Sequence, residues 1–158
     1  MNFRYDTYCG LFCGACEALL SVEAGEIDKL ADRWNTPAED MECHGCKSGK
    51  ISMFCRTCKI KMCAEERELQ FCSECNDFPC PMISDFHRRE APNPTIIRNN
   101  LEVISKNGVD AWISSQKSRW MCEHCGSKFS YTDSICGACG KKVYTIKEEV
   151  ENMLKGEK

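Results

Sequence analysis

Cysteine constrains the fold of this chain more than any other residue type. Fifteen of its 158 residues are cysteines, and nearly all of them lie in short C-x2-C or C-x3-C runs. Because their number is odd, disulfide bonds alone cannot pair every thiol. Clustered thiols also bind metal ions, and the free energy of binding then contributes to folding. The sequence therefore predicts a small fold built around metal sites.

The first residues and the hydropathy of the chain bear on its compartment. The opening segment, MNFRYD, lacks the basic start and the apolar stretch of a secretory signal. No segment approaches the roughly 20 apolar residues that a membrane helix needs. We therefore expect a cytoplasmic protein without a membrane span, a setting in which clustered thiols are metal ligands more often than disulfides. A secreted disulfide scaffold is the less favoured alternative.

The strongest metal motif lies near the C-terminus, where two C-x2-C pairs are separated by ten residues. Its cysteines are Cys122, Cys125, Cys136 and Cys139. Two such pairs joined by a hairpin are typical of a zinc ribbon, and four thiolates leave the ion no open position for catalysis. Gly126 and Gly140 follow the pairs. We expect both to adopt the left-handed conformation that turns backbone N–H groups toward the sulfurs.

A duplication lies between residues 43 and 80, a region with many cysteines and little apolar periodicity. At a constant offset of 17 residues, the matching sets are Phe54, Cys55, Cys58, Cys63 and Phe71, Cys72, Cys75, Cys80. Two copies are too few for a solenoid. They predict two similar metal knuckles, made of loops and short turns, that pack against each other.

The cysteine pair Cys43 and Cys46 gives one grouping of the N-terminal ligands. If each joins one repeat triplet, two closed four-thiolate sites result. Sequence order is a weak guide, because cross-braced zinc modules interleave their pairs. Zinc is favoured over iron–sulfur clusters here, although all-thiolate sites accept either. Cys80 and Pro81 are similar to the Cys-Pro ending of ferredoxin runs, but the spacing before them differs.

The N-terminal triplet Cys9, Cys13 and Cys16 is then left without a fourth thiolate. His44 or His87 is a candidate fourth ligand, as is a thiolate shared between two ions. The C-x3-C-x2-C spacing is that of the radical-SAM cluster motif. The chain lacks the repeated strands and the Gly-Gly-Glu run of those enzymes, so the spacing alone does not support their chemistry.

Helices are expected on both sides of the cysteine-rich region. Apolar periodicity and stop signals place them at residues 17–24, 27–34, 94–107, 110–117 and 147–154. Pro94 suits a first helical position, and Gly108 stops that helix. Thr145 and Glu148 form a capping box for the last one. Residues 119–146 predict short strands around the ribbon cysteines.

Charge gives only a weak indication of a partner. The net charge is −3, so the chain lacks the basic surface typical of nonspecific nucleic-acid binding. A small basic excess at residues 86–120 predicts a weak basic-aromatic face for protein or nucleic acid. Its members are Arg88, Arg89, Arg98, Lys106, Trp112, Lys117, Arg119 and Trp120. A solvated helix surface over buried tryptophans is the favoured alternative.

Four motifs, in order, carry a resemblance to a known family. C-G-L-F-C-G-A-C at 9–16, C-H-G-C at 43–46, C-K-I-K-M-C-A at 58–64 and F-C-S-E-C-N-D-F-P-C at 71–80 together resemble a prokaryotic cysteine-rich domain of unknown function. The resemblance covers about residues 5–90 and implies a small metal-binding domain without an assigned reaction. The C-terminal motif is similar to zinc ribbons in general, which implies a fold and no function.

These observations predict a small metal-stabilised α+β protein. Its parts are a cysteine-rich multi-zinc module at 1–90, a helical connector at 91–118, a zinc ribbon at 119–146 and a C-terminal helix and tail at 147–158. No Ser-His-Asp triad, paired carboxylates or phosphate loop marks an active site, so we favour a non-enzymatic zinc-binding interaction module. The alternatives are an iron–sulfur or redox enzyme that uses the N-terminal triplet, and a metal sensor or carrier.

Overall fold

Short helices joined by loops make up most of the chain. The computed structural model describes residues 2–88 and 94–156. Its helices are α1 (Glu17–Glu23), α2 (Ile27–Trp34), α3 (Ala38–Met41), α4 (Met53–Arg56), α5 (Lys59–Glu66), α6 (Pro81–Ser84), α7 (Pro94–Asn107), α8 (Val109–Arg119) and α9 (Ile146–Gly156). Single 3₁₀ turns are η1 (Cys13–Ala15), η2 (Cys72–Glu74) and η3 (Asp85–Arg88).

Strand structure is sparse in the described part of the chain. It is limited to two isolated antiparallel bridges, one between Met121 and Lys128 and one between Ile135 and Lys142. Both lie in residues 119–146, the segment predicted as a zinc ribbon, which is called the ribbon below. The protein is therefore small, cysteine-rich and mostly helical, with less strand than the expected α+β class.

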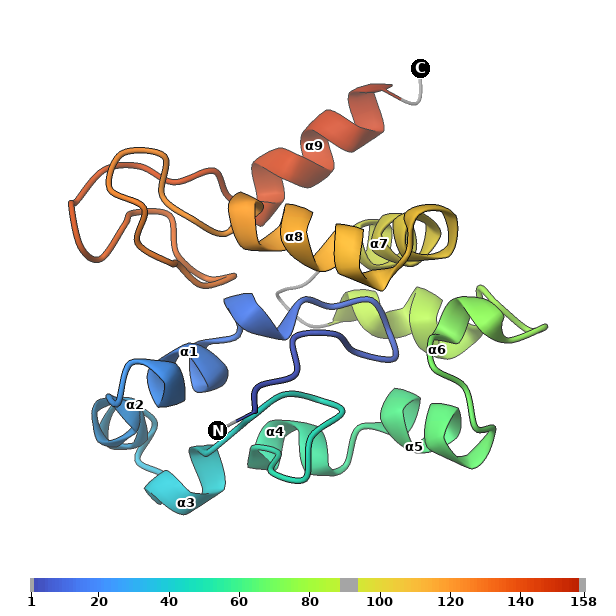
Figure 1. Cartoon of the computed structure of the whole chain (residues 1–158), viewed down its shortest axis with the longest axis horizontal. Coiled ribbons are helices and arrows are strands. Elements are labelled where there is room, and N and C mark those ends of the chain that lie inside the picture. The colour runs from blue at the N-terminus through green and yellow to red at the C-terminus, as the bar shows by residue number, and fades with distance from the viewer. Residues whose placement is uncertain (1, 89–93, 157–158) are drawn as a thin grey trace.

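The chain folds around its own N-terminal segment (Figure 1). That segment runs through the middle of the molecule. Helices α2 to α5 lie on one side of it, and α7, α8 and the ribbon loops lie on the other. Helix α9 leaves the ribbon and carries the C-terminal end to the periphery.

Most helices outside the cysteine-rich region lie where the sequence predicts them, although the four-residue helix α3 after Pro37 was not predicted. Helices α1 and α2 are separated at Gly25, and α7 ends before Gly108. At the start of α9, the N–H of Glu148 donates to Oγ1 of Thr145 at 3.2 Å, and the N–H of Thr145 donates to Oε2 of Glu148 at 2.9 Å, which confirms the capping box. None of the described helices combines the length and the apolar composition that crossing a bilayer requires.

The cysteine-rich region contains more helix than the sequence predicts. Helices α4 and α5 lie inside it, where we expected loops and short turns, and α6 directly follows it. Helix α5 buries only Ile60 and Ala64. Two buried positions on one short helix are too few to give a recognisable apolar period in the sequence.

Three clusters of buried side chains form the core. The first joins the ribbon, α8 and α9 to the N-terminal segment through Phe12, Trp112 and Trp120. The second packs α5, α6 and α7 around Cys9, and the third packs α1, α2 and α3 against Cys43. Cysteines therefore lie inside the core, and the ribbon shares its apolar interior with the rest of the chain.

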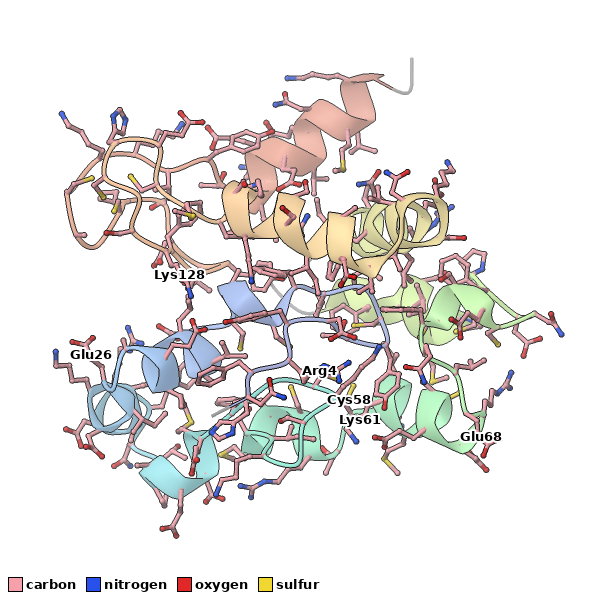
Figure 2. All side chains as sticks on the ribbon, in the orientation of Figure 1. Arg4, Glu26, Cys58, Lys61, Glu68 and Lys128 are labelled. Atoms are coloured by element: carbon pink, nitrogen blue, oxygen red, sulfur yellow. The ribbon has the colours of Figure 1, made fainter. Side chains whose placement is uncertain are left out.

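Side chains of the ribbon hairpin fix it to the N-terminal segment. The hydroxyl of Tyr131 donates to the carbonyl of Phe12 at 2.7 Å and accepts from the N–H of Phe12 at 2.8 Å. The N–H of Tyr131 donates to the carbonyl of Ala15 at 3.0 Å. Lys128 points from the ribbon toward α1 (Figure 2), where its Nζ lies 2.7 Å from Oε2 of Glu23.

Candidate metal centres

The four ribbon cysteines form one compact group of thiols. The sulfurs of Cys122 and Cys139 lie 3.7 Å apart, those of Cys125 and Cys136 lie 3.6 Å apart, and all four lie within 4.8 Å of one another. A tetrahedral ion with metal–sulfur bonds of about 2.3 Å, the length found for zinc, places its ligand sulfurs about 3.8 Å apart. The ribbon therefore offers a closed four-thiolate site for a single ion.

Backbone hydrogen bonds shape the two halves of the ribbon site in the same way. The N–H of Gly126 donates to the carbonyl of Cys122 at 2.8 Å, and the N–H of Gly140 donates to that of Cys136 at 2.9 Å. The glycines have φ angles of 73° and 71°, the left-handed conformation expected from the sequence. A side chain there costs roughly 1 to 2 kcal/mol. Each loop thereby turns both thiols of its pair toward one point.

The thiol of Cys125 ionises easily. Hydrogen bonds from the hydroxyl and the N–H of Ser127 lower the pKa of Cys125 to about 6, which favours its thiolate form. The thiolate is the form that binds a metal ion.

Four further cysteines line a cavity between α5 and α6. They are Cys63, Cys72, Cys75 and Cys80. The cavity has a volume of about 30 Å³, and the rest of its lining is apolar. Helix α5 carries Cys63, η2 begins at Cys72, and Cys80 immediately precedes α6. Burial, and after it the neighbouring thiols of Cys9 and Cys80, raise the pKa of Cys72 to about 12.

Another group of thiols lies beside α1 and α3. Its members are Cys13, Cys16, Cys43 and Cys55. Cys16 packs against the core cluster that contains Cys43. Burial, and after it the thiols of Cys16 and Cys43, raise the pKa of Cys55 to about 12. Burial and then the thiol of Cys16 also raise the pKa of Cys13 well above its ordinary value.

The remaining thiols, those of Cys9, Cys46 and Cys58, adjoin this group. Burial, and after it the neighbouring thiol of Cys9, raise the pKa of Cys46 to about 12. Burial raises the pKa of Cys9, and the thiol of Cys58 adds to the increase. The N–H of Cys46 donates toward the sulfur of Cys13. The two groups therefore form one continuous patch of thiols along the N-terminal segment.

This arrangement differs from the grouping that sequence order suggests. Within the N-terminal triplet, Cys9 adjoins Cys46 and Cys58 and also packs in the core cluster that contains Cys72, whereas Cys13 and Cys16 adjoin Cys43. The first repeat triplet is divided, because Cys63 lines the cavity of the second repeat.

The two repeats nevertheless share a local structure. The N–H of Cys58 donates to the carbonyl of Cys55, the N–H of Cys75 donates to that of Cys72, and both distances are 3.2 Å. Helix α5 begins directly after the first pair, whereas α6 begins only at Pro81. The third cysteine of each repeat consequently has a different structural position, yet both face the same cavity.

The N-terminal thiols are adjacent but more widely spaced than those of the ribbon. Within residues 2–88 and 94–156, only the ribbon brings together three or more Cys, His, Asp or Glu ligand atoms that all lie within 4.8 Å of one another. A single zinc ion does not bridge wider gaps at its usual bond length.

The candidate histidine ligands have other surroundings where the structure describes them. Nε2 of His44 lies 3.2 Å from Oε1 of Glu42, and its ring contacts the ring of Phe3 edge-on. His124 is exposed on the first ribbon knuckle. The side chain of His87 lies outside the described part of the chain.

The two tryptophans of the predicted basic-aromatic face are buried in the core. Trp112 and Trp120 are 1% and 3% exposed. The guanidinium of Arg119 lies over the ring of Trp120, 4.2 Å from its centroid, while the lysines at 106 and 117 are exposed. Arg89 and the side chain of Arg88 lie outside the described residues.

Two basic side chains near the thiols were not singled out from the sequence. Nη1 of Arg67 donates to Sγ of Cys75 at 3.1 Å. Lys47 is buried, and its Nζ lies 2.9 Å from Oδ2 of Asp6. For Lys47 the one available signal was its position directly after Cys46, because its contact with Asp6 joins segments distant in sequence. Arg67 lies only eight residues before Cys75, but no sequence motif marks this contact.

Comparisons with known proteins place the N-terminal part of the chain in a family. No curated protein matched the chain, and no solved structure matched it. The family described as a protein of unknown function, DUF3795, matches residues 5–85. This range covers just over half of the chain and includes every cysteine outside the ribbon. The chain therefore belongs to the DUF3795 family of proteins of unknown function.

Proposed function

We propose that this chain is a multi-metal-binding protein that acts as an interaction module and has no catalytic site of its own. The ribbon holds a structural zinc ion, and the N-terminal cysteines hold further thiolate-bound metal, for which the sequence favours zinc. The observation that carries the proposal is the spacing of 3.6 to 3.7 Å between ribbon sulfurs. Such a closed site contributes folding free energy and leaves no position for a substrate.

Exposed aromatic side chains support a protein partner. Trp34 of α2 and Phe54 of α4 are 52% and 45% exposed, and their rings meet edge to face with centroids 5.5 Å apart. Large exposed aromatic side chains are the usual anchors of protein interfaces. The net charge of −3 and the burial of Trp112 and Trp120 give less support to nucleic acid.

Metal analysis of two ribbon variants tests the proposal. Cys125→Ser removes one ligand of the ribbon, so we expect this protein to lose about one zinc per chain and to keep its N-terminal metal. His124→Ala, in the same knuckle, is the matched control and keeps its zinc, because the four thiolates already complete the site. Equal zinc contents in the two variants contradict the ribbon assignment.

A metal carrier is the second candidate, and one observation favours it. Cys125 and Cys139 are exposed, so a chelator can reach the ribbon ion without unfolding the chain. A carrier transfers zinc to a chelator faster than the protein unfolds, whereas a structural site releases it at the rate of global unfolding.

A further inference from the structure

The cavity between α5 and α6 differs from the ribbon site in the spacing of its sulfurs. Its four cysteines are Cys63, Cys72, Cys75 and Cys80. All four belong to the described residues, among which only the ribbon has three ligand atoms within 4.8 Å of one another. No three of the cavity sulfurs therefore come as close together as a single tetrahedral ion draws its ligands.

The ribbon serves as an internal standard for this comparison. Its sulfurs lie 3.6 to 3.7 Å apart in pairs, close to the value of about 3.8 Å for one zinc ion. In a [4Fe–4S] cluster, four iron atoms at alternate corners of a cube each bind one thiolate, so the cysteine sulfurs stand about 6 to 7 Å apart. The cube of iron and sulfide fills the space between them. No three of the four cavity sulfurs lie within 4.8 Å of one another, a wider spacing that favours the second arrangement.

The lining of the cavity has the composition of a cluster pocket. Apart from its cysteines it consists of apolar side chains, which include Ile60, Phe78 and Ile83. An apolar lining keeps water from the inorganic sulfides, and solvent exposure is one of the factors that set the potential of a cluster. A mononuclear zinc site leaves no void between its four sulfurs, so the cavity of about 30 Å³ has no role in such a site.

Two charged groups reach this otherwise apolar site, Arg67 and Asp77, and Oδ2 of Asp77 lies 3.9 Å from Sγ of Cys75. Nη1 of Arg67 donates to Sγ of Cys75 at 3.1 Å and also lies 2.7 Å from Oδ2 of Asp77. Hydrogen bonds to ligand sulfurs raise the reduction potential of a cluster, because they stabilise the additional negative charge of its reduced form. Arg67 is half exposed, so it can be replaced without opening the core.

We propose that Cys63, Cys72, Cys75 and Cys80 hold a [4Fe–4S] cluster, in place of the zinc that the sequence favours. The proposal deepens the proposed function and rests on it only in part, since the ribbon zinc and the cluster occupy different residues. The cluster has four protein ligands and no open iron. It therefore serves electron storage or folding and binds no substrate.

Iron and sulfide analysis tests the assignment. The full chain is purified without oxygen and incubated with ferric iron, sulfide and a thiol reductant that reduces part of the iron. We expect a broad absorbance near 400 nm, together with about four irons and four sulfides that are lost in Cys72→Ser. Cys125→Ser is the matched control, since it loses the ribbon zinc and keeps this iron. Zinc loss with unchanged iron in Cys72→Ser, or absence of iron after incubation, overturns the proposal.

A second variant keeps the test decisive if Cys72→Ser does not fold. Arg67→Ala removes the hydrogen bond to Cys75 and leaves all four ligands in place. We expect the reduction potential of the cluster to become more negative while its iron content is unchanged. Arg33→Ala on α2, which removes an exposed ion pair with Glu17, is the control and leaves the potential unaltered. Equal potentials in the two variants place the redox-active iron elsewhere and contradict the assignment.

The two proposals fail in distinguishable ways, because zinc and iron are measured in the same samples. Loss of zinc in Cys125→Ser without any iron in the wild-type chain supports the ribbon and rejects the cluster. Iron that depends on Cys72, in a chain whose zinc does not depend on Cys125, supports the cluster and rejects the ribbon assignment.

Discussion

Gly45 is the residue at which the C-H-G-C turn meets the N-terminal segment. Its φ angle is 113°, in a region that residues with a side chain rarely adopt. A Cβ atom there would lie 1.8 Å from the carbonyl oxygen of Arg4. The N–H of Arg4 donates to the carbonyl of His44 at 2.8 Å. The contact between the two segments, which sets the positions of Cys43 and Cys46, therefore requires glycine.

We expect Gly45→Ala to lower the free energy of unfolding of the metal-loaded protein by about 3 kcal/mol or more, since both the φ angle and the backbone clash oppose a side chain. Denaturant unfolding measures the change. Gly49→Ala is the matched control in the same loop, because no atom lies within 4 Å of its Cβ position. Its effect should stay within about 0.5 kcal/mol. Equal stability of the two variants contradicts the role of Gly45.

At the scale of single elements, the start of α9 shows how local charge supports a helix. The carboxylate of Glu148 pairs with Nζ of Lys142 and accepts hydrogen bonds from the N–H and the hydroxyl of Thr145. These contacts, that with Lys142 first, lower the pKa of Glu148 from 4.5 to about 2. Because the folded pKa lies below the unfolded one, the stabilisation is complete above pH 4.5 and is lost as the pH falls toward 2.

The ionisation of Glu148 can be followed by NMR. We expect the chemical shift of its carboxyl carbon to remain nearly constant from pH 7 to pH 4, because a group with a pKa of about 2 stays ionised there. In Lys142→Ala the main cause of the lowered pKa is removed, so the chemical shift of the Glu148 carboxyl carbon should begin to change by pH 4. A midpoint near 4.5 in the wild-type chain contradicts the capping geometry.

At the scale of the whole molecule, sequence predicts the parts of this protein better than their assembly. The ribbon ligands form a local motif, and α2 and α7 each have a full apolar face. The sequence therefore predicts the ribbon ligands and these two helices. The sequence does not predict how the other cysteines are grouped, because Cys63 and Cys80 come together only through the packing of α5 on α6. Contacts between distant segments decide which thiols share a metal.

Tyr131 joins the ribbon to the N-terminal segment, so its hydroxyl should contribute to the stability of both. We expect Tyr131→Phe to cost about 2 kcal/mol or more, because the buried N–H and carbonyl of Phe12 both lose their partner. Tyr144→Phe is the control, since that ring is 40% exposed and its hydroxyl only accepts from Asn152. Similar unfolding free energies for the two variants contradict the tether.

The shared core predicts that the ribbon metal stabilises more than the ribbon. Cys122 and Cys136 belong to the same buried cluster as Trp112 and Trp120, so release of the ion frees two of its members. The third tryptophan, Trp34, is 52% exposed and is removed as a reporter in Trp34→Phe. In that variant we expect chelation of the ribbon zinc to shift tryptophan emission to longer wavelength, because water then reaches both indoles. Unchanged emission after zinc loss would show that the ribbon unfolds independently of α8 and the N-terminal segment.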